Sequence, residues 1–117
     1  MKRKTIRNHR DFLTAPEDIG VRAPYFFVKT KPAKYPLDPR YGIIVSKRTL
    51  KPAVDRNRAK RLLCDWIYFN EEYMLSDLDY IFIITRNILG ATREEGRDAM
   101  NRALKRIVRY HKTNANH

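Results

Sequence analysis

The side chains best suited to chemistry in this sequence are cations, and they are concentrated in one segment. Residues 47–61 contain seven Lys or Arg side chains and one acid, Asp55. A solvated helix face normally mixes both signs of charge, so this bias favours a surface that binds a polyanion. Three of the five cations from Lys51 to Arg61 are arginine, whose planar fork holds a phosphate through two hydrogen bonds. The cations predicted to contact a nucleic-acid backbone are Lys47, Arg48, Lys51, Arg56, Arg58, Lys60 and Arg61.

The sequence contains no set of residues with the types and spacing of a hydrolytic or metal centre. Asp77 and Asp79 are the only paired carboxylates near the start of an expected strand. The adjacent Glu pairs at 71–72 and 94–95 point apart on expected helices, and the three histidines are scattered. Cys64 is the only cysteine, which excludes a zinc site of the usual spacing. We therefore expect no catalytic residue and no metal site.

The whole chain has the composition of a folded protein that binds nucleic acid. Its 117 residues fit one domain, and 25 Lys and Arg against 13 Asp and Glu leave a net charge of +12. Hydrophobic residues make up 43%, too many for a disordered chain, and no apolar run approaches the roughly 18 to 20 residues of a membrane span. One cysteine and no apolar signal segment indicate a reducing, cytoplasmic location. We predict a single RNA-binding domain over residues 1–117, with flexible tails at 1–6 and 111–117.

Hydrophobic periodicity predicts the elements that position these residues. In chain order we expect a short capped helix at 8–13, a strand at 25–30, a loop or hairpin connection at 31–40, a strand at 41–46, a helix at 54–69, a strand at 80–85 and a helix at 93–110. In the helix at 54–69 the apolar residues, Leu63 and Trp66 among them, share one arc and the cations occupy the rest. The predicted order is α-β-β-β-α-β-α. It describes an α+β fold, an α/β sandwich with helices packed on a small sheet.

The basic segment also carries a resemblance to a known family. The string Arg56-Asn57-Arg58-Ala59-Lys60-Arg61, preceded by Ser46-Lys47-Arg48 at the end of an expected strand, resembles the signature of the bacterial ribonuclease P protein subunit. Asp11-Phe12, and Asp79-Tyr80-Ile81 with Arg86, are similar to further parts of that family, so the resemblance covers about residues 5–110.

The resemblance implies a fold, a function and a set of partners. The family's protein is the small subunit of a ribonucleoprotein whose RNA, with Mg²⁺, hydrolyses a phosphodiester at the 5′ end of precursor tRNA. The protein alone is then expected to be inactive and to bind no cofactor itself. The signature residues Arg56, Asn57, Arg58, Lys60 and Arg61 would face the catalytic RNA. The family also implies a left-handed βαβ crossover into and out of this helix, contrary to the usual right-handed rule.

A second binding surface is expected for the single-stranded 5′ leader of precursor tRNA, which the family holds in a cleft between its first helix and one sheet face. Alternation along 25–30 places Tyr25, Phe27 and Lys29 on one face, and since lysine is rarely buried, we expect this face to be open. Tyr25 and Phe27 would stack on leader bases, with Lys29 near a phosphate. Phe12 matches the family's helix aromatic and is expected at the cleft edge; core packing of Phe12 and Phe27 is the alternative.

A basic structural protein of another ribonucleoprotein, such as the ribosome, is the alternative function that composition alone fits equally well. The aromatic cleft beside the signature helix favours ribonuclease P, because a purely structural binder would not need it. The sequence departs from the family pattern at Asp65, where another basic residue is common, so the cationic helix face is shorter. The expected partners are the catalytic RNA and precursor tRNA, with no membrane and no small-molecule substrate.

Overall fold

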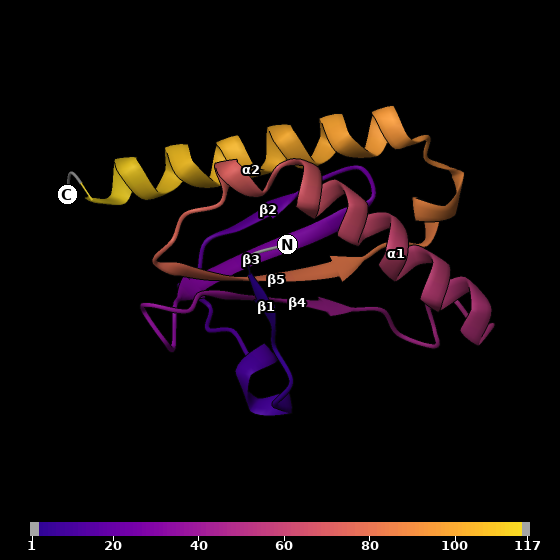
Figure 1. Ribbon diagram of the computed structural model, residues 1–117, viewed down its shortest axis with the longest axis horizontal. Coiled ribbons are helices and arrows are strands. Elements are labelled where there is room, and N and C mark those ends of the chain that lie inside the picture. The colour runs from indigo at the N-terminus through magenta and orange to yellow at the C-terminus, as the bar shows by residue number, and fades with distance from the viewer. Residues whose placement is uncertain (1–2, 116–117) are drawn as a thin grey trace.

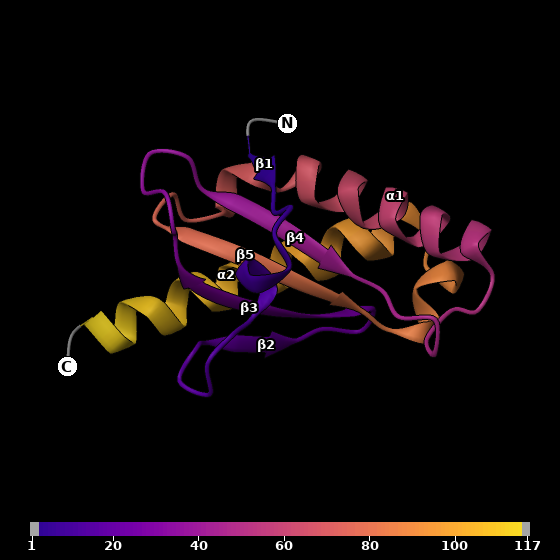
Figure 2. The same ribbon diagram turned by 90° about the horizontal axis from the view of Figure 1, so that it is seen from below.

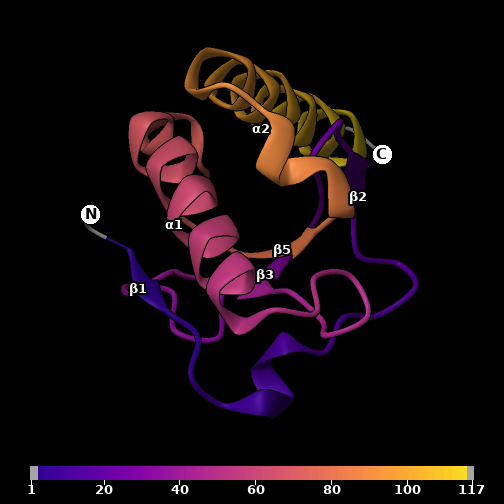
Figure 3. The ribbon, with the colours of Figure 1, turned by 90° about the vertical axis from the view of Figure 1, so that its right-hand side faces the viewer.

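Two long helices lie side by side on one face of a mixed sheet (Figures 1 and 3). This computed structural model describes residues 3–115. Within that range the strands are β1 (Lys4–Thr5), β2 (Gly20–Arg22), β3 (Phe26–Pro32), β4 (Arg40–Ile44) and β5 (Leu78–Ile84), and the helices are α1 (Ala53–Phe69) and α2 (Arg93–Ala115). Short 3₁₀ helices connect them: η1 (His9–Phe12), η2 (Glu71–Tyr73) and η3 (Arg86–Gly90). With η1 counted as the first helix and the short η2 and η3 left out, the order from there on is the predicted α-β-β-β-α-β-α, but its first strand, β2, lies where the sequence analysis placed no strand.

The helices bury the faces that the sequence pattern predicts. In α1 the residues Ala59, Leu63 and Trp66 are fully buried in the core. In α2 the same holds for Met100 and Leu104, four residues apart on one side of the helix. Burial of these apolar stripes is what holds both helices on the sheet.

The sheet has the strand order β1-β4-β5-β3-β2 and an uncommon connection. β4 and β5 are parallel neighbours with Tyr41 opposite Tyr80, and α1 joins them. In Figure 3 both strands run toward the viewer, α1 lies above them, and β5 is on the side of β4 away from β1. Viewed from the helices with the strands pointing up, β5 therefore lies to the left of β4. The crossover is left-handed, as the family resemblance implies, and is an exception to the common rule.

The two faces of the sheet are covered differently. On β3, Phe26 and Val28 point toward the helices and are fully buried, whereas Phe27 and Lys29 point to the other side and are half-buried. On β5, Ile83 pairs with Phe27 and is 37% exposed. Figure 2 views the molecule from this second side, where η1 lies in front of the strands. We call it the open face.

The chain ends differ from the prediction of flexible tails. β1 pairs in parallel with β4, and Ile6, directly after it, is 5% exposed, so residues 3–6 form an ordered sheet edge. Residues 111–115 continue α2, where Nε2 of His111 lies 2.9 Å from the hydroxyl of Thr30. These backbone and side-chain contacts connect residues 3–6 and His111 to the sheet, whereas the prediction gave both segments as tails. The other predicted tail residues, 1–2 and 116–117, lie outside the described residues.

Candidate nucleic-acid interfaces

The short helix η1 lies on the open face and brings Phe12 to it. The side chain of Asn8 caps η1 by accepting a hydrogen bond from the Arg10 amide at 3.0 Å. The Phe12 ring packs directly over Gly42 of β4, where a Cβ atom would collide with the ring. Phe12 therefore occupies the predicted position at the edge of the open face.

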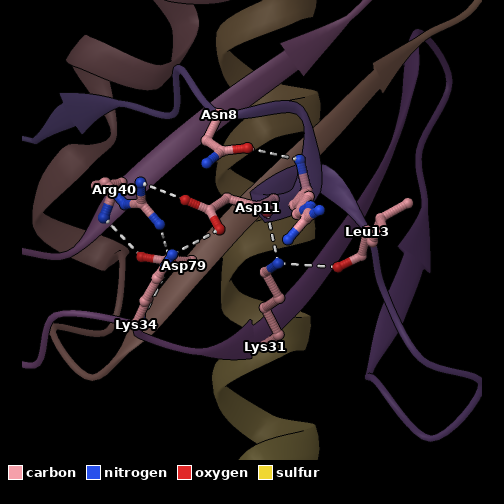
Figure 4. Close-up of polar contacts among 8 residues, drawn as sticks. Asn8, Asp11, Leu13, Lys31, Lys34, Arg40 and Asp79 are labelled. Carbon is pink, nitrogen blue, oxygen red and sulfur yellow. Dashed lines mark hydrogen bonds and ion pairs between the residues drawn. The ribbon is translucent and has the colours of Figure 1, made fainter.

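A buried ionic cluster fixes η1 to the sheet (Figure 4). Asp11 and Arg40 are each 8% exposed and Asp79 is 0% exposed. The Arg40 guanidinium donates to Asp11 Oδ2 at 3.0 Å and to Asp79 Oδ2 at 3.5 Å, and its backbone amide donates to Asp79 Oδ1 at 2.8 Å. Lys34 adds a bond to Asp11 Oδ1 at 3.1 Å, and these bonds from Lys34 and Arg40 lower the pKa of the Asp11 carboxyl. We call Asp11, Arg40 and Asp79 the clamp.

Two lysines of β3 hold the end of η1 and the segment that follows it. The Lys31 ammonium donates to the carbonyl oxygens of Asp11 and, at 2.8 Å, of Leu13 (Figure 4). The Lys29 ammonium donates to the carbonyl of Ala15 at 3.2 Å. Lys29, predicted to contact a leader phosphate, thus also has a structural role on the open face.

Tyr25 does not lie where the sequence analysis placed it. β3 begins at Phe26, and the Ala23 amide donates to the Phe26 carbonyl, so Tyr25 belongs to the turn between β2 and β3. Its ring centroid is 5.8 Å from that of Trp66 on α1. The predicted alternation fails at Tyr25 because the extended conformation starts one residue later. The structure brings Phe12, Phe27 and Lys29 together on the open face and leaves Tyr25 on the helix side.

The basic segment forms an exposed surface on α1 and the loop before it. Arg56 is the exception, because its guanidinium donates to the carbonyls of Leu50 at 2.9 Å and Lys51 at 2.6 Å and so closes the loop onto the helix. The other predicted contact residues are exposed: Lys47, Arg48, Lys51, Asn57, Arg58, Lys60 and Arg61.

The sequence did not reveal the ion pairs that support these two surfaces. The clamp residue Arg40 meets Asp79 only because strand register puts β4 beside β5, and no local pattern indicates that pairing. Asp65 accepts two hydrogen bonds from Arg97 of α2, at 3.0 and 3.1 Å, and ties the two helices together. The acid at position 65 was a signal, since it interrupts a basic helix face, but its partner lies 32 residues away.

Comparison with known proteins decides the family. The sequence pattern of the family described as Ribonuclease P matches residues 1–108. This chain belongs to the ribonuclease P protein family. A Ribonuclease P protein component from a Nitratiruptor species is 32% identical over 108 residues, which cover 91% of this chain and 94% of that protein.

Two further relatives agree in sequence and in shape. The Ribonuclease P protein component of Pseudomonas entomophila is 34% identical over 71 residues, 61% of this chain, and the match spans about half (53%) of that longer relative. The solved RNase P protein of Staphylococcus aureus superposes with a TM-score of 0.72 at 27% identity, covering 89% of this chain and 94% of that one. Both matches agree with membership of the ribonuclease P protein family, and the comparisons give no support to a ribosomal protein. Among residues 3–115, no helix combines the length and apolar character that crossing a bilayer requires.

Proposed function

We propose that this ribonuclease P protein binds the catalytic RNA through α1 and the loop before it, and the 5′ leader of precursor tRNA through the open face. It thereby assists removal of the leader to give the mature 5′ end. Catalysis belongs to the RNA and its Mg²⁺. The described residues include no group of three or more His, Cys, Asp or Glu side chains that could hold a metal ion.

The distribution of charge supports the assignment of α1 to the catalytic RNA. Arg58, Lys60 and Arg61 are exposed, and none of them pairs with an acidic side chain among residues 3–115. Arginine and lysine at this density neutralise backbone phosphates and release counterions, which is the main source of affinity for RNA. The recognition is sequence-independent, as suits a folded RNA whose shape is fixed.

The open face has what a single strand of any sequence requires. Strand register places Ile81 of β5 opposite Gly42, over which Phe12 lies, and Ile83 opposite Phe27. Two aromatic rings therefore stand on either side of an apolar β5 floor, and bases of any type can stack on such rings. The observation that carries the proposal is that the clamp holds Phe12 on this face, opposite the helices that carry the cations.

Cleavage of a precursor tRNA with a 5′ extension by the cognate catalytic RNA tests the proposal. At low Mg²⁺ concentration, the protein should accelerate cleavage by that RNA, since it adds the leader contacts that the RNA lacks. The protein freed of RNA should cleave nothing. Equal rates with and without protein would contradict the proposal, and so would cleavage by the protein alone that withstands nuclease controls.

A further inference from the structure

Three arginines converge at a hollow between α1 and the start of α2. The hollow has a volume of about 230 Å³. Arg58 and Arg61 reach it from α1, and Arg93, the first residue of α2, reaches it from the other side. Its lining residues are Arg58, Arg61, Leu62, Asp65, Trp66 and Arg93. We call this hollow the arginine cradle.

The three guanidinium groups are free, whereas the one carboxylate beside them is already neutralised. Among the described residues, none accepts a hydrogen bond from the side chain of Arg58, Arg61 or Arg93 or forms an ion pair with it. Asp65 instead accepts two bonds from Arg97, in the parallel geometry that arginine and a carboxylate favour. The cradle therefore keeps an uncompensated positive charge, which an anion would balance.

The floor and the rim of the cradle are rigid. Trp66 is fully buried, and its indole Nε1 has no hydrogen-bond partner. The indole packs against Gly96 in the first turn of α2 so closely that any Cβ there would collide with it. Thr92 and Glu95 cap α2 reciprocally, with the Glu95 amide donating to Thr92 Oγ1 at 3.1 Å and the Thr92 amide to Glu95 Oε1 at 2.9 Å. Arg93 thus projects from a fixed helix start.

We infer that the arginine cradle binds a phosphate of an RNA backbone, with Arg93 of α2 completing a site that Arg58 and Arg61 begin on α1. The inference rests on the proposed function of α1 and specifies it further. Guanidinium groups that approach from two helices can bind more of the oxygens of one phosphodiester than a row of arginines on a single helix can. Because Arg58 and Arg61 belong to the surface assigned to the catalytic RNA, that RNA supplies the phosphate, and precursor tRNA is the other arm of the test.

The variant Arg93→Gln tests the cradle. Its control is a second variant that loses the same charge elsewhere on α2. Arg109→Gln removes one exposed cation from the same helix, far from the cradle, and serves as the control. Affinity of each protein for the catalytic RNA and, in the holoenzyme, for precursor tRNA is measured at several salt concentrations. We expect Arg93→Gln to weaken binding of the catalytic RNA by roughly tenfold and to reduce the salt slope by about 0.7 to 0.9. Arg109→Gln should match the parent.

Variants of the neighbouring ion pair give a second readout. Arg97 is not one of the three arginines proposed to bind the phosphate. Arg97→Gln should nevertheless weaken binding of the catalytic RNA, because it leaves the Asp65 carboxylate beside the cradle without its partner and that negative charge repels a phosphate. Adding Asp65→Asn to Arg97→Gln should restore the affinity, since no unbalanced carboxylate then remains. A structural role of Arg97 alone would predict no such rescue.

The only tryptophan of the chain reports on the site directly. Inorganic phosphate, titrated at constant ionic strength against chloride, should change Trp66 fluorescence in a saturable way in the parent and not in Arg93→Gln. If Arg93→Gln binds the catalytic RNA like the parent while Arg58→Gln binds more weakly, the cradle is wrong and the proposed function stands. If neither variant weakens binding, both are wrong. A selective loss of precursor tRNA affinity would overturn the assignment to the catalytic RNA.

Discussion

At the scale of single residues, the Asp11 carboxylate decides where Phe12 lies. Removing a charge from water is costly unless partners replace the lost solvation. Asp11 has such partners in Lys34 and Arg40, and the bond from Arg40 joins this helix residue to β4. The side chain of a helix residue thereby becomes an anchor to the sheet.

Asp11→Asn should lower the free energy of unfolding at neutral pH, because it leaves Arg40 with one ionised partner instead of two. The folded pKa of Asp11 lies below its ordinary value of 3.8, so its stabilising effect is present above that value and is lost as pH falls through the folded pKa. The difference between parent and variant, measured by urea unfolding at several pH values, should therefore shrink in acid. Asp38→Asn, which breaks the exposed pair with Lys4, is the control and should change little at any pH. A difference that is constant down to acid pH would show that Asp11 acts through shape and not charge.

Phe27→Ala should remove the preference of the holoenzyme for precursor tRNA with a leader over mature tRNA, by roughly 1 to 3 kcal/mol. Phe27 is half-buried on the open face, so the loss of stability should be modest. Phe26→Ala, one residue earlier and fully buried against the helices, is the contrast and should cost about 3 to 5 kcal/mol of stability. Equal losses of affinity for both RNAs with a large fall in Tm would place Phe27 in the core instead.

At the scale of elements, hydrophobic periodicity predicts the long helices and strands. It cannot predict the short strands. The helix at 54–69 and the strands at 25–30 and 80–85 are found within one or two residues of their predicted bounds, because their apolar patterns repeat over several turns or pleats. β1 and β2 were missed, since two and three residues are too few for any pattern. The clamp was missed because it depends on which strands pair, and Tyr25 was misplaced because strand starts are not marked in the sequence.

Gly42→Ala should lift η1 from the open face. A Cβ at Gly42 would strike the Phe12 ring, so either the ring or η1 must move. The expected result is a loss of leader-dependent affinity with unchanged binding of the catalytic RNA, measured with precursor and mature tRNA. Gly90→Ala is the matched control, because a Cβ there meets nothing within 4 Å. Leader-dependent affinity that survives Gly42→Ala would mean that the position of Phe12 is irrelevant to the leader.

Replacing Arg58 and Arg61 of α1 together with alanine should weaken binding of the catalytic RNA without unfolding the protein, since both side chains are exposed. Two lost phosphate contacts should lower the salt slope of the logarithm of affinity by about 1.4 to 1.8. Arg109 and Lys112, exposed near the end of α2, make a double control with the same change in charge. An unchanged salt slope in the Arg58 and Arg61 variant would show that these side chains face solvent and contact no phosphate.

At the scale of the whole molecule, the sheet separates the two surfaces that we propose to bind different RNAs. The helices that carry the cations lie on one side and η1 with Phe12 on the other (Figures 1 and 2). The buried residues between them, such as Phe82 and Leu63, form one packed core. Under the proposed function, a protein built in this way holds the catalytic RNA and the leader at the same time, and the thickness of the sheet and helix layers sets their relative position.

This separation predicts that changes on opposite faces act independently. Phe27→Ala and the Arg58/Arg61→Ala pair should add in their effects on the free energy of precursor cleavage, within about 0.5 kcal/mol, because they share no partners. The measurement is kcat/KM for parent, both variants and their combination, at a protein concentration too low to saturate the catalytic RNA. Asp11→Asn combined with Phe12→Ala is the coupled counterpart, and its effects on leader affinity should not add, since the clamp acts through the helix that carries Phe12. A coupling of about 1 kcal/mol or more between Phe27 and the arginines would show that the core transmits changes from one RNA-binding face to the other.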